Sequence, residues 1–402
     1  MAAGALAAAA LLLPTAPAAA ADLGPWRDIP PRATWGPERG VTDVEPTSAT
    51  EAWISGYQGR LSVRGPQPPN PPGGGPPPPR ALHTLVKPKP MLQRWTGGTG
   101  WTSHSPPGLP GEGIINAIDS SAPDHVWFCG HLWNSGHIDA YAARWDGAEL
   151  TRIAIPLAGS CTDVLVHGQH AFLYEQGRVH HRRPNGTWAS FDADKPAFAL
   201  AGPEPGVYLQ ADGKLRKWDG SGFAALPAAL TDGLHLATRE HGFWSFRPDA
   251  PYRWDGTAWQ AVAKPADYTP PYMHSSTSNY YTDADGPWFA TVPPHPAGPD
   301  QSSVYHWNGT DWDRFEPGSV GPYYAQLPTD LHADDSGRVW AVTTQGRSYL
   351  EGTTWTQLPD ATGLLHFHTL PGGQVLAYGD GQGLASTETD QTITVKTTAP
   401  LP

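Results

Sequence analysis

Arg144-Trp145-Asp146-Gly147 is one copy of a short motif that recurs along this 402-residue chain. Further copies are Lys217-Trp218-Asp219-Gly220, Arg253-Trp254-Asp255-Gly256 and His306-Trp307-Asn308-Gly309, and a second aromatic residue usually follows each of them. An Asp-Gly or Asn-Gly pair between aromatic and β-branched runs is the strongest short-range signal for a β-hairpin. Because the hairpin recurs at intervals of tens of residues, the sequence predicts one structural unit copied around an axis or along a stack.

The composition of the chain indicates an ordered protein rich in strands. Gly and Pro each number 45, which suits many short strands joined by turns, or else disorder. The 18 Trp residues favour the ordered alternative, since disordered segments are poor in large aromatics. The formal net charge of -12 argues against a nucleic-acid partner, because phosphate binding requires clustered Lys and Arg. We find no apolar run that predicts a membrane span.

Residues 1–21 are predicted to form a secretory signal peptide. Ala5 to Leu13 supply an apolar core, and Ala19-Ala20-Ala21 supply a small-residue cleavage site before Asp22. We therefore expect a secreted, extracellular protein whose mature chain, residues 22–402, forms a single domain. In such a protein a disulfide between Cys129 and Cys161, which lie in adjacent repeat units, is favoured over two free thiols. The alternative is that both are small buried core residues.

Each repeat unit is predicted to contain four antiparallel strands. The second strand carries an aromatic residue, as in Val126-Trp127-Phe128, Phe243-Trp244-Ser245 and Val339-Trp340-Ala341, and the third strand ends at the Trp-Asp-Gly turn. Four-stranded units repeated radially form a β-propeller, an all-β fold that hides strand edges by closing a ring.

The unit count predicts eight blades, with seven as the alternative. Seven units are complete, and an eighth, from Leu364 to about Glu388, supplies three strands. The segment Leu23 to Pro30 is expected to supply the missing outer strand, so that pairing of the N- and C-terminal segments closes the ring. Thr392 to Thr397 could compete for that outer position.

The Arg-Trp-Asp-Gly-Thr-x-Trp turn, preceded by a Val-Trp-Ala-Val strand, resembles the tryptophan-rich repeats of secreted bacterial β-propeller proteins. The resemblance covers nearly all of the mature chain. The turn is also distantly similar to the sialidase Asp-box, although it lacks the Ser and the spacing of that motif. In both families the motif is structural, with Trp packing between blades and Asp-Gly forming the turn, so the resemblance implies a fold and no reaction.

Insertions into the repeat predict the side of the ring that carries function. The connection between the second and third strands is long at Gly65 to Arg80, His131 to Tyr141 and Pro293 to Ser303, and long links between units occupy Ser105 to Glu112, Pro265 to Thr277 and Pro317 to Leu327. Because turns alternate between the two faces of a propeller, all these segments are expected on one face, where variable loops usually bind ligands. The Pro/Gly-rich Gly65 to Arg80 segment is expected to be an exposed spacer, with a recognition ligand as the alternative.

These insertions carry side chains suited to recognition. The candidate binding residues are Trp133, Asn134, His137, Asp139, Tyr268, Tyr272, Tyr323 and Tyr324. Aromatic rings beside Asn, Asp and His suit a glycan, and they also suit a protein interface, in which Tyr and Trp are enriched. The alternative for each aromatic is that it only pins its loop to the scaffold.

The predicted innermost strands carry a second departure from the repeat. Aligned on the second-strand aromatic, the residues eight positions upstream are Glu45, Asp119, Val164, Leu200, Leu236, Tyr280, His332 and His368. Those ten positions upstream include Asp43, Asp330 and His366. The polar members gather in the units that carry the long loops. His180 and His181 are expected to face solvent.

Three interpretations of this polar ring follow. Carboxylate and imidazole groups from neighbouring blades could bind a divalent metal ion, with Glu45, Asp119, His332 and His368 as candidates. They could instead supply acid/base catalysis for a lyase or hydrolase, with Asp330, His332, His366, His368, Asp43, Glu45 and Asp119 as candidates. We favour a hydrated channel, because no ligand motif such as H-E-x-x-H supports a metal, and no phosphate-binding or dinucleotide motif indicates another cofactor.

The leading hypothesis is a secreted propeller that binds a surface glycan or a partner protein through its decorated face. The first alternative is an enzyme with its site at the mouth of the central channel. The second is a subunit of a secreted assembly that docks its partner on the Trp-Asp-Gly face.

Overall fold

The computed structural model describes residues 27–29, 39–58, 63–64, 82–83, 88–97, 100–109, 111–134, 137–200, 206–226, 234–238, 242–255, 258–265, 268, 280–282, 287–291, 303–315, 330–333, 338–343, 346–351, 354–358, 366–370, 375–379 and 395–397. The predicted signal peptide and the Gly65 to Arg80 segment lie outside these residues. Within the described residues no helix is long and apolar enough to cross a membrane.

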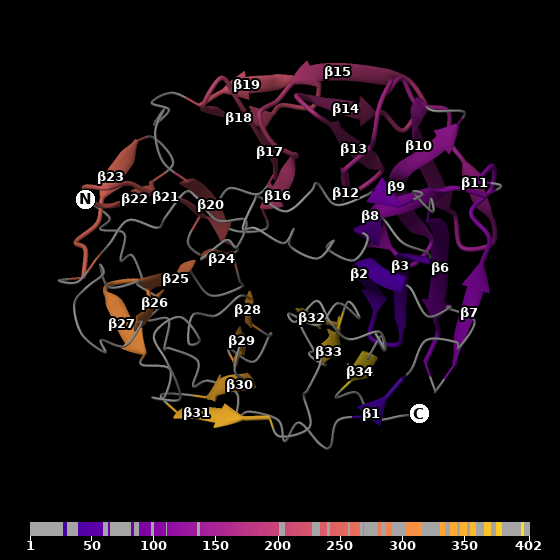
Figure 1. The fold of residues 1–402 in the computed structure, drawn as a ribbon. Helices are drawn as coiled ribbons and strands as arrows, with labels where there is room; N and C mark the ends of the chain where they lie inside the picture. Colours follow the sequence, from indigo (N-terminus) through magenta and orange to yellow (C-terminus); the bar gives the residue numbers. More distant parts are fainter. Residues whose placement is uncertain are drawn as a thin grey trace, which may run out of the picture.

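The described strands form four-stranded antiparallel sheets arranged around a ring, which is a β-propeller (Figure 1). In four of these blades the strands, from the centre outward, are as follows. One blade contains β2 (Arg39–Ser48), β3 (Glu51–Gln58), β6 (Lys89–Trp95) and β7 (Trp101–His104), and the next contains β8 (Gly113–Ala122), β9 (His125–Asn134), β10 (His137–Trp145) and β11 (Leu150–Arg152). The following two contain β12 (Asp163–His167), β13 (His170–Glu175), β14 (Arg178–Arg182) and β15 (Trp188–Asp192), and β16 (Phe198–Leu200), β17 (Gly206–Ala211), β18 (Lys214–Trp218) and β19 (Phe223–Ala225).

Three further sheets have the same strand order. They are β20 (Leu234–Thr238), β21 (Gly242–Phe246), β22 (Pro251–Trp254), β23 (Trp259–Ala261); β24 (Tyr280–Thr282), β25 (Pro287–Thr291), β26 (Ser303–Trp307), β27 (Trp312–Phe315); and β28 (Asp330–Ala333), β29 (Val339–Thr343), β30 (Gly346–Glu351), β31 (Thr354–Gln357). A separate two-stranded ladder, β4 (Val63–Arg64) with β5 (Leu82–His83), lies in the chain between β3 and β6.

The two ends of the chain meet in one sheet. Its order is β32 (His366–Thr369), β33 (Val375–Tyr378), β34 (Val395–Thr397) and β1 (Arg27–Asp28). The N-terminal strand is therefore the outer strand of a sheet otherwise built from the C-terminus, and Arg27 pairs with Thr397. The expected outer strand from Leu23 to Pro30 is confirmed, because β1 takes that position, whereas Thr392 to Thr397, the competing candidate, supplies the third strand β34. Trp101 anchors this junction, because its Nε1 donates to the Ile29 carbonyl at 2.8 Å.

The recurring motif forms the turn between the third and fourth strands of the blades that carry it. Asp146 N donates to the Glu149 carbonyl at 3.2 Å, and the Asp146 carboxylate accepts bonds from two backbone N–H groups of the same turn. Gly147 has a φ of +96°, a conformation that side chains with a Cβ rarely adopt. Asp219 and Asn308 form equivalent turns. The Asx side chain and the glycine are thus required by the turn.

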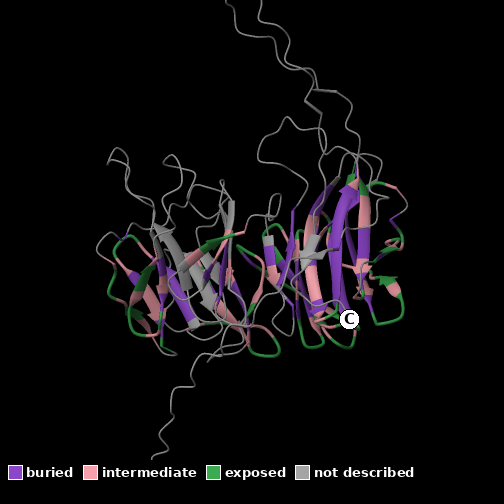
Figure 2. Ribbon diagram, turned by 90° about the horizontal axis from the view of Figure 1, so that it is seen from below, coloured by how far each residue is buried: buried purple, intermediate pink, exposed green. Residues whose placement is uncertain are grey.

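Aromatic side chains of the second strand fill the space between neighbouring blades. Trp53 of β3 is fully buried and contacts Phe128 of β9 edge-on, with ring centroids 5.0 Å apart. Trp244 contacts Trp307 of the next blade in the same way, at 5.2 Å. Figure 2 shows the resulting pattern, with buried residues along the strands and exposed residues at many of the turns. Burial of these large aromatic rings therefore stabilises the contacts between blades.

The innermost strands confirm part of the sequence alignment. Glu45, Asp119, Leu236, His332 and His368 each lie opposite the expected residue of the second strand. In three other blades the register is shifted, so that Leu165, Phe198 and Tyr281 take the positions expected for Val164, Leu200 and Tyr280. The reason is that the turn joining the first two strands differs in length between blades, and pairing follows the turn.

Candidate binding site

The β9–β10 hairpin presents one face with both aromatic and aliphatic groups. Side chains alternate between the faces of a strand, so His131 and Trp133 share one face of β9. Ile138 lies directly opposite Trp133 in the ladder and joins that face. Leu132, between the two β9 residues, points the other way and packs against the core. The hairpin therefore has a core-facing side and a second side, formed by His131, Trp133 and Ile138, which we call the hairpin face.

Ile138 is the feature of the hairpin face that packing does not explain. It is 45% exposed, and no other large hydrophobic side chain of the described residues is exposed to this degree. Trp133 beside it is partly exposed. The Trp133 ring meets the His131 ring edge-on, with centroids 4.5 Å apart. An apolar pair open to water next to a polar ring is a typical start of a recognition surface.

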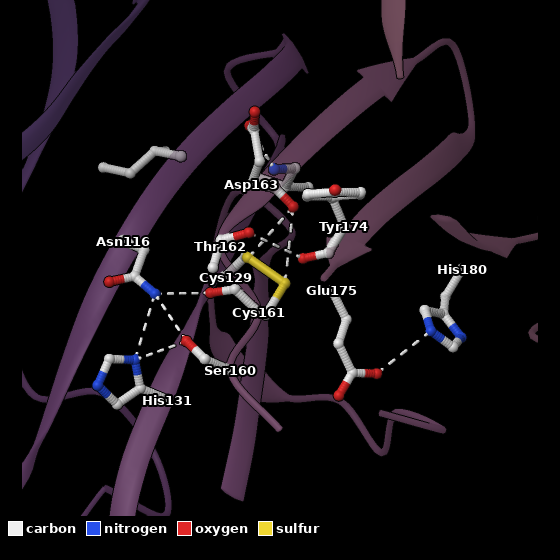
Figure 3. Close-up of a disulfide and its surroundings, with 12 residues drawn as sticks. Asn116, Cys129, His131, Ser160, Cys161, Thr162, Asp163, Tyr174, Glu175 and His180 are labelled. Atoms are coloured by element: carbon white, nitrogen blue, oxygen red, sulfur yellow. Dashed lines mark hydrogen bonds and ion pairs between the residues drawn. A yellow bond between two sulfur atoms is a disulfide. The ribbon is translucent and has the colours of Figure 1, made fainter. Parts of the chain in front are cut away.

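Polar side chains of Asn116 and Ser160 contact the His131 ring (Figure 3). Ser160 Oγ lies 2.9 Å from His131 Nδ1. Asn116 Nδ2 lies 3.3 Å from the same nitrogen and 3.3 Å from Ser160 Oγ, and it donates to the Cys161 carbonyl at 2.6 Å. Asn116 is the extra residue of a β-bulge in β8, since Ile115 and Ala117 pair with consecutive residues of β9. The bulge turns the amide toward the next blade.

Both tautomers of His131 satisfy this network, because Asn116 Nδ2 has two N–H groups for three acceptors. When the second N–H of Asn116 points at His131 Nδ1, that nitrogen accepts and the Ser160 hydroxyl donates to it. The proton of the neutral ring then resides on Nε2, which has no hydrogen-bond partner among the described residues. Burial lowers the pKa of His131, so the ring is neutral near pH 7. In this tautomer His131 offers one N–H donor beside the Trp133 ring.

The predicted disulfide is confirmed and lies next to this network. Cys129 of β9 is bonded to Cys161, in the segment that leads into β12, and both residues are fully buried. The bond joins two neighbouring blades, since β9 and β12 belong to different sheets. It holds Ser160, the neighbour of Cys161, beside His131. The disulfide therefore positions the polar part of the site.

The other candidate binding residues have different surroundings. His137 is exposed and Asp139 is partly exposed, and both lie in β10 near the tip of the hairpin. Tyr268 was expected to be exposed, but it is buried, and its hydroxyl donates to the Arg247 carbonyl at 2.8 Å because the ring packs into the core beside Trp244. Asn134 ends β9, and its side chain lies outside the described residues, as do Tyr272, Tyr323 and Tyr324 entirely.

The carboxylates of the innermost strands join neighbouring blades. Asp43 of β2 accepts a bond from the Ile118 backbone N–H of β8 at 2.7 Å. Asp119 of β8 likewise accepts a bond from the Val166 backbone N–H of β12. Glu45 accepts the Ser120 hydroxyl at 2.5 Å. An inner strand has one edge without a ladder partner, so these carboxylates satisfy backbone donors that would otherwise lack a protein acceptor.

Burial shifts the protonation of the same groups. Removal from water raises the pKa of Asp119 to about 7, although its two backbone bonds oppose the shift. It raises the pKa of Glu45 well above the ordinary value, and the nearby Asp119 charge adds to the effect. Asp163, at the start of β12, has a pKa of about 6 for the same reason. Raised pKa values occur at catalytic sites, but here hydrogen bonds between blades also account for the position of each carboxylate.

Two histidines of the predicted polar ring come from neighbouring blades. The His332 and His368 rings lie 6.3 Å apart, and His368 stacks on Tyr378. Asp330 and His366 begin β28 and β32, but their side chains lie outside the described residues. In the described part of the chain, no group of three or more His, Cys, Asp or Glu side chains is arranged to hold a metal ion.

Sequence reasoning did not single out Asn116 or Ser160. Asn116 occupies a bulge that alternation of side chains does not reveal. Ser160 precedes Cys161, so the predicted disulfide was the one signal that could have brought it next to β9. The predicted long connection from His131 to Tyr141 was wrong, because β9 extends to Asn134 and β10 begins at His137, and within this extended hairpin His131 links the hairpin face to the polar network.

Comparison with known proteins supports the fold only. Neither a protein-family model nor a curated protein matches the chain. Among solved structures, the computationally designed Ika8 protein is similar, with 13% identity, a TM-score of 0.51, and coverage of 89% of this chain and 96% of that one. Chaetomium thermophilum Sqt1, bound to the N-terminus of ribosomal protein L10, is 9% identical with a TM-score of 0.50 and the same coverage. YCF48 from Cyanidioschyzon merolae is 12% identical, with a TM-score of 0.46 and coverage of 92% and 98%.

Proposed function

We propose that this protein is a binding module that recognises a partner protein through the hairpin face. The observation that carries the proposal is the exposed Ile138 directly opposite Trp133. The chain buries its other described large hydrophobic side chains at least in part, so an apolar pair left open at a hairpin tip requires a reason. Interfaces are enriched in aromatic residues, and a few apolar anchors supply most of their binding energy.

The polar network suits the same role. The His131 N–H next to Trp133 provides a directional contact beside the apolar anchor, and Ser160 with Asn116 holds the ring in place. A ring that is already oriented loses less entropy on binding. The Sqt1 propeller, whose structure contains a segment of ribosomal protein L10, illustrates the use of such a scaffold for a peptide ligand.

We further propose that the protein is exported and that its ring has eight blades. Disulfides form and persist in oxidising compartments, so the Cys129–Cys161 bond supports the signal peptide expected at residues 1–21. Each four-stranded sheet of the described chain then counts as one blade, and the sheet that contains β1 and β34 closes the ring. The mass of the mature protein recovered from culture medium tests the cleavage before Asp22.

The proposed function is tested with the mature protein as bait in cross-linking to proteins of the culture medium. Wild type is compared with Ile138→Ser and Trp133→Ala, and Trp188→Ala is the matched control because Trp188 is partly exposed on an outer strand of another blade. We expect a partner captured by wild type and control to be lost in both hairpin variants. Its purified form should bind the variants at least about tenfold more weakly. Equal capture of the partner by all four proteins contradicts the proposal. If wild type binds a sugar on a glycan array and Trp133→Ala does not, the ligand of the hairpin face is a glycan and not a protein.

A further inference from the structure

Three histidines lie on one face of the β12–β15 blade, at the end opposite the hairpin face. His167 and His170 face each other directly across the β12–β13 hairpin. His181 lies opposite Phe172, which is two residues beyond His170 and so shares its face. Side chains directly opposite in an antiparallel pair have Cβ atoms within about 5.5 Å. The three imidazoles, which come from the adjacent strands β12, β13 and β14, therefore lie close together on this face.

Two of these imidazoles are already in contact. His170 Nδ1 lies 2.8 Å from His181 Nε2, and the two rings are stacked with an interplanar angle of 29° and centroids 5.0 Å apart. His181 is fully buried, because it stacks on Phe172 and meets the Trp218 ring of the next blade edge-on. His170 is partly exposed. One ring is therefore held rigidly by the core, and the other is reachable from solvent.

The second ring nitrogen of His181 is a separate observation. Its Nδ1 is buried and has no hydrogen-bond partner among the described residues. In the N–H···N bond between the two rings, only one of the facing nitrogens carries a proton. A metal ion between the rings needs both facing nitrogens unprotonated, so the proton moves to the far nitrogen of the same ring. No proton need leave the pair, because each neutral imidazole keeps one N–H.

We propose that His170 Nδ1 and His181 Nε2 chelate a divalent transition-metal ion, Cu²⁺ or Ni²⁺, with solvent molecules completing its coordination. Imidazole nitrogen suits these ions. With metal–nitrogen bonds of about 2.1 Å, a nitrogen separation of 2.8 Å corresponds to an angle of roughly 85° at the metal. Square-planar and octahedral ions require angles near this value, whereas tetrahedral Zn²⁺ requires a wider one.

Protonation and local charge bear on the affinity. Burial lowers the pKa of His170 and brings that of His181 to about 4, so both rings are neutral at pH 7 and able to bind a metal. After burial, the charges of His167 and Arg183 lower the pKa of His170, and those of His170 and Arg183 lower the pKa of His181. Repulsion from Arg183 weakens the site.

The test uses the mature chain without a polyhistidine tag and CuCl₂ or NiCl₂ alone as the probe. Titration calorimetry at pH 7.5 measures affinity, and Cu²⁺ electron paramagnetic resonance counts the nitrogen ligands. His170→Ala removes one ligand from a partly exposed position, and His181→Phe removes the other while keeping an aromatic ring on Phe172. His137→Ala is the control, since His137 is exposed on the hairpin at the other end of the ring.

We expect one metal per chain, two or more nitrogen ligands, and weaker binding of Zn²⁺ than of Cu²⁺. Each ligand variant should lower the affinity by at least about tenfold, and the control should bind like wild type. Unchanged affinity in both ligand variants overturns the proposal. So does a loss of binding in His137→Ala, because it places the metal elsewhere. Since this site is remote from Trp133, neither result bears on the proposed partner binding.

Discussion

Ser160 Oγ lies 2.9 Å from His131 Nδ1, although the two residues are 29 positions apart in the sequence and lie in different blades. The contact spans the boundary between the β8–β11 and β12–β15 blades. It depends on the disulfide at Cys161, on the bulge at Asn116 and on the packing of the two blades. The hairpin face is thus tied to the scaffold through groups contributed by two repeat units.

Removal of the disulfide should destabilise the protein and loosen the site. The bond joins residues 32 positions apart, and constraint of a loop of this length in the unfolded chain corresponds to about 3–4 kcal/mol. We expect Cys129→Ala/Cys161→Ala to lower the free energy of unfolding by this amount in urea titrations. Ser160→Ala, which keeps the disulfide, is the control and should change stability by about 1 kcal/mol. A double variant as stable as Ser160→Ala would contradict this account.

Removal of the Asn116 side chain should cost stability through the boundary between blades. Asn116→Ala leaves the buried Cys161 carbonyl without the 2.6 Å bond, and an unsatisfied buried group costs about 1–3 kcal/mol. The matched change is Thr42→Val, because Thr42 is the bulged residue of β2 and donates to the Ile115 carbonyl in the equivalent position. Urea denaturation should show similar losses for both variants. Only Asn116→Ala should affect ligand binding.

The stability of the protein should depend on the buried carboxylates as pH changes. Asp119 has a pKa of about 7 in the folded protein against an ordinary value of 3.8, so the folded state binds the proton more tightly than the unfolded state. Its contribution is fully present below pH 3.8 and is lost as pH rises through about 7. His181, with a pKa of about 4 against 6.5, acts in the opposite direction, since its contribution is lost as pH falls through that interval.

Comparison of variants separates the two effects. Between pH 4 and 7 the melting temperature of Asp119→Asn should fall less, or rise more, than that of wild type, because the amide cannot ionise. Asp192→Asn is the control, since Asp192 is exposed on an outer strand. If the melting temperatures of wild type and Asp119→Asn change equally with pH across this range, the pKa of Asp119 is not raised in the folded protein.

The repeat tryptophans should act as scaffold residues. Trp53 is fully buried between two blades, in contact with Phe128 and Trp145. Trp53→Ala should therefore reduce the free energy of unfolding by about 3–5 kcal/mol. Trp188→Ala, at a partly exposed tryptophan, should cost clearly less. Equal losses, measured by guanidinium denaturation, would contradict a role of the second-strand aromatics in joining blades.

The fold was predictable because its signals are local. The Asp-Gly pair of the Trp-Asp-Gly motif specifies a turn by itself, and the spacing of its copies specifies repetition. The disulfide was also predictable, since the chain has only two cysteines. The N-terminal outer strand of the closing sheet was predicted as well, but its third strand was not, because β34 lies beyond the segment from Leu364 to Glu388 in which that strand was expected.

The site was predictable only in part. Trp133 stood out as an aromatic residue in an insertion, but the burial of Tyr268 depends on packing against Trp244, which the sequence does not display. His181, expected to face solvent, is fully buried because Phe172 and Trp218 enclose its ring. Asn116 and Ser160 acquire their roles from a bulge and a contact between blades. Such contacts between distant segments become visible only when the ring is assembled.

The most direct test of the central claim is the affinity of the identified partner for wild type and for Ile138→Ser, measured with purified proteins. Ile138 is 45% exposed, so its replacement should leave the melting temperature unchanged. We expect the dissociation constant to rise at least about tenfold in Ile138→Ser and to stay at the wild-type value in Trp188→Ala. A dissociation constant that is the same in all three proteins would show that the ligand binds somewhere other than the hairpin face.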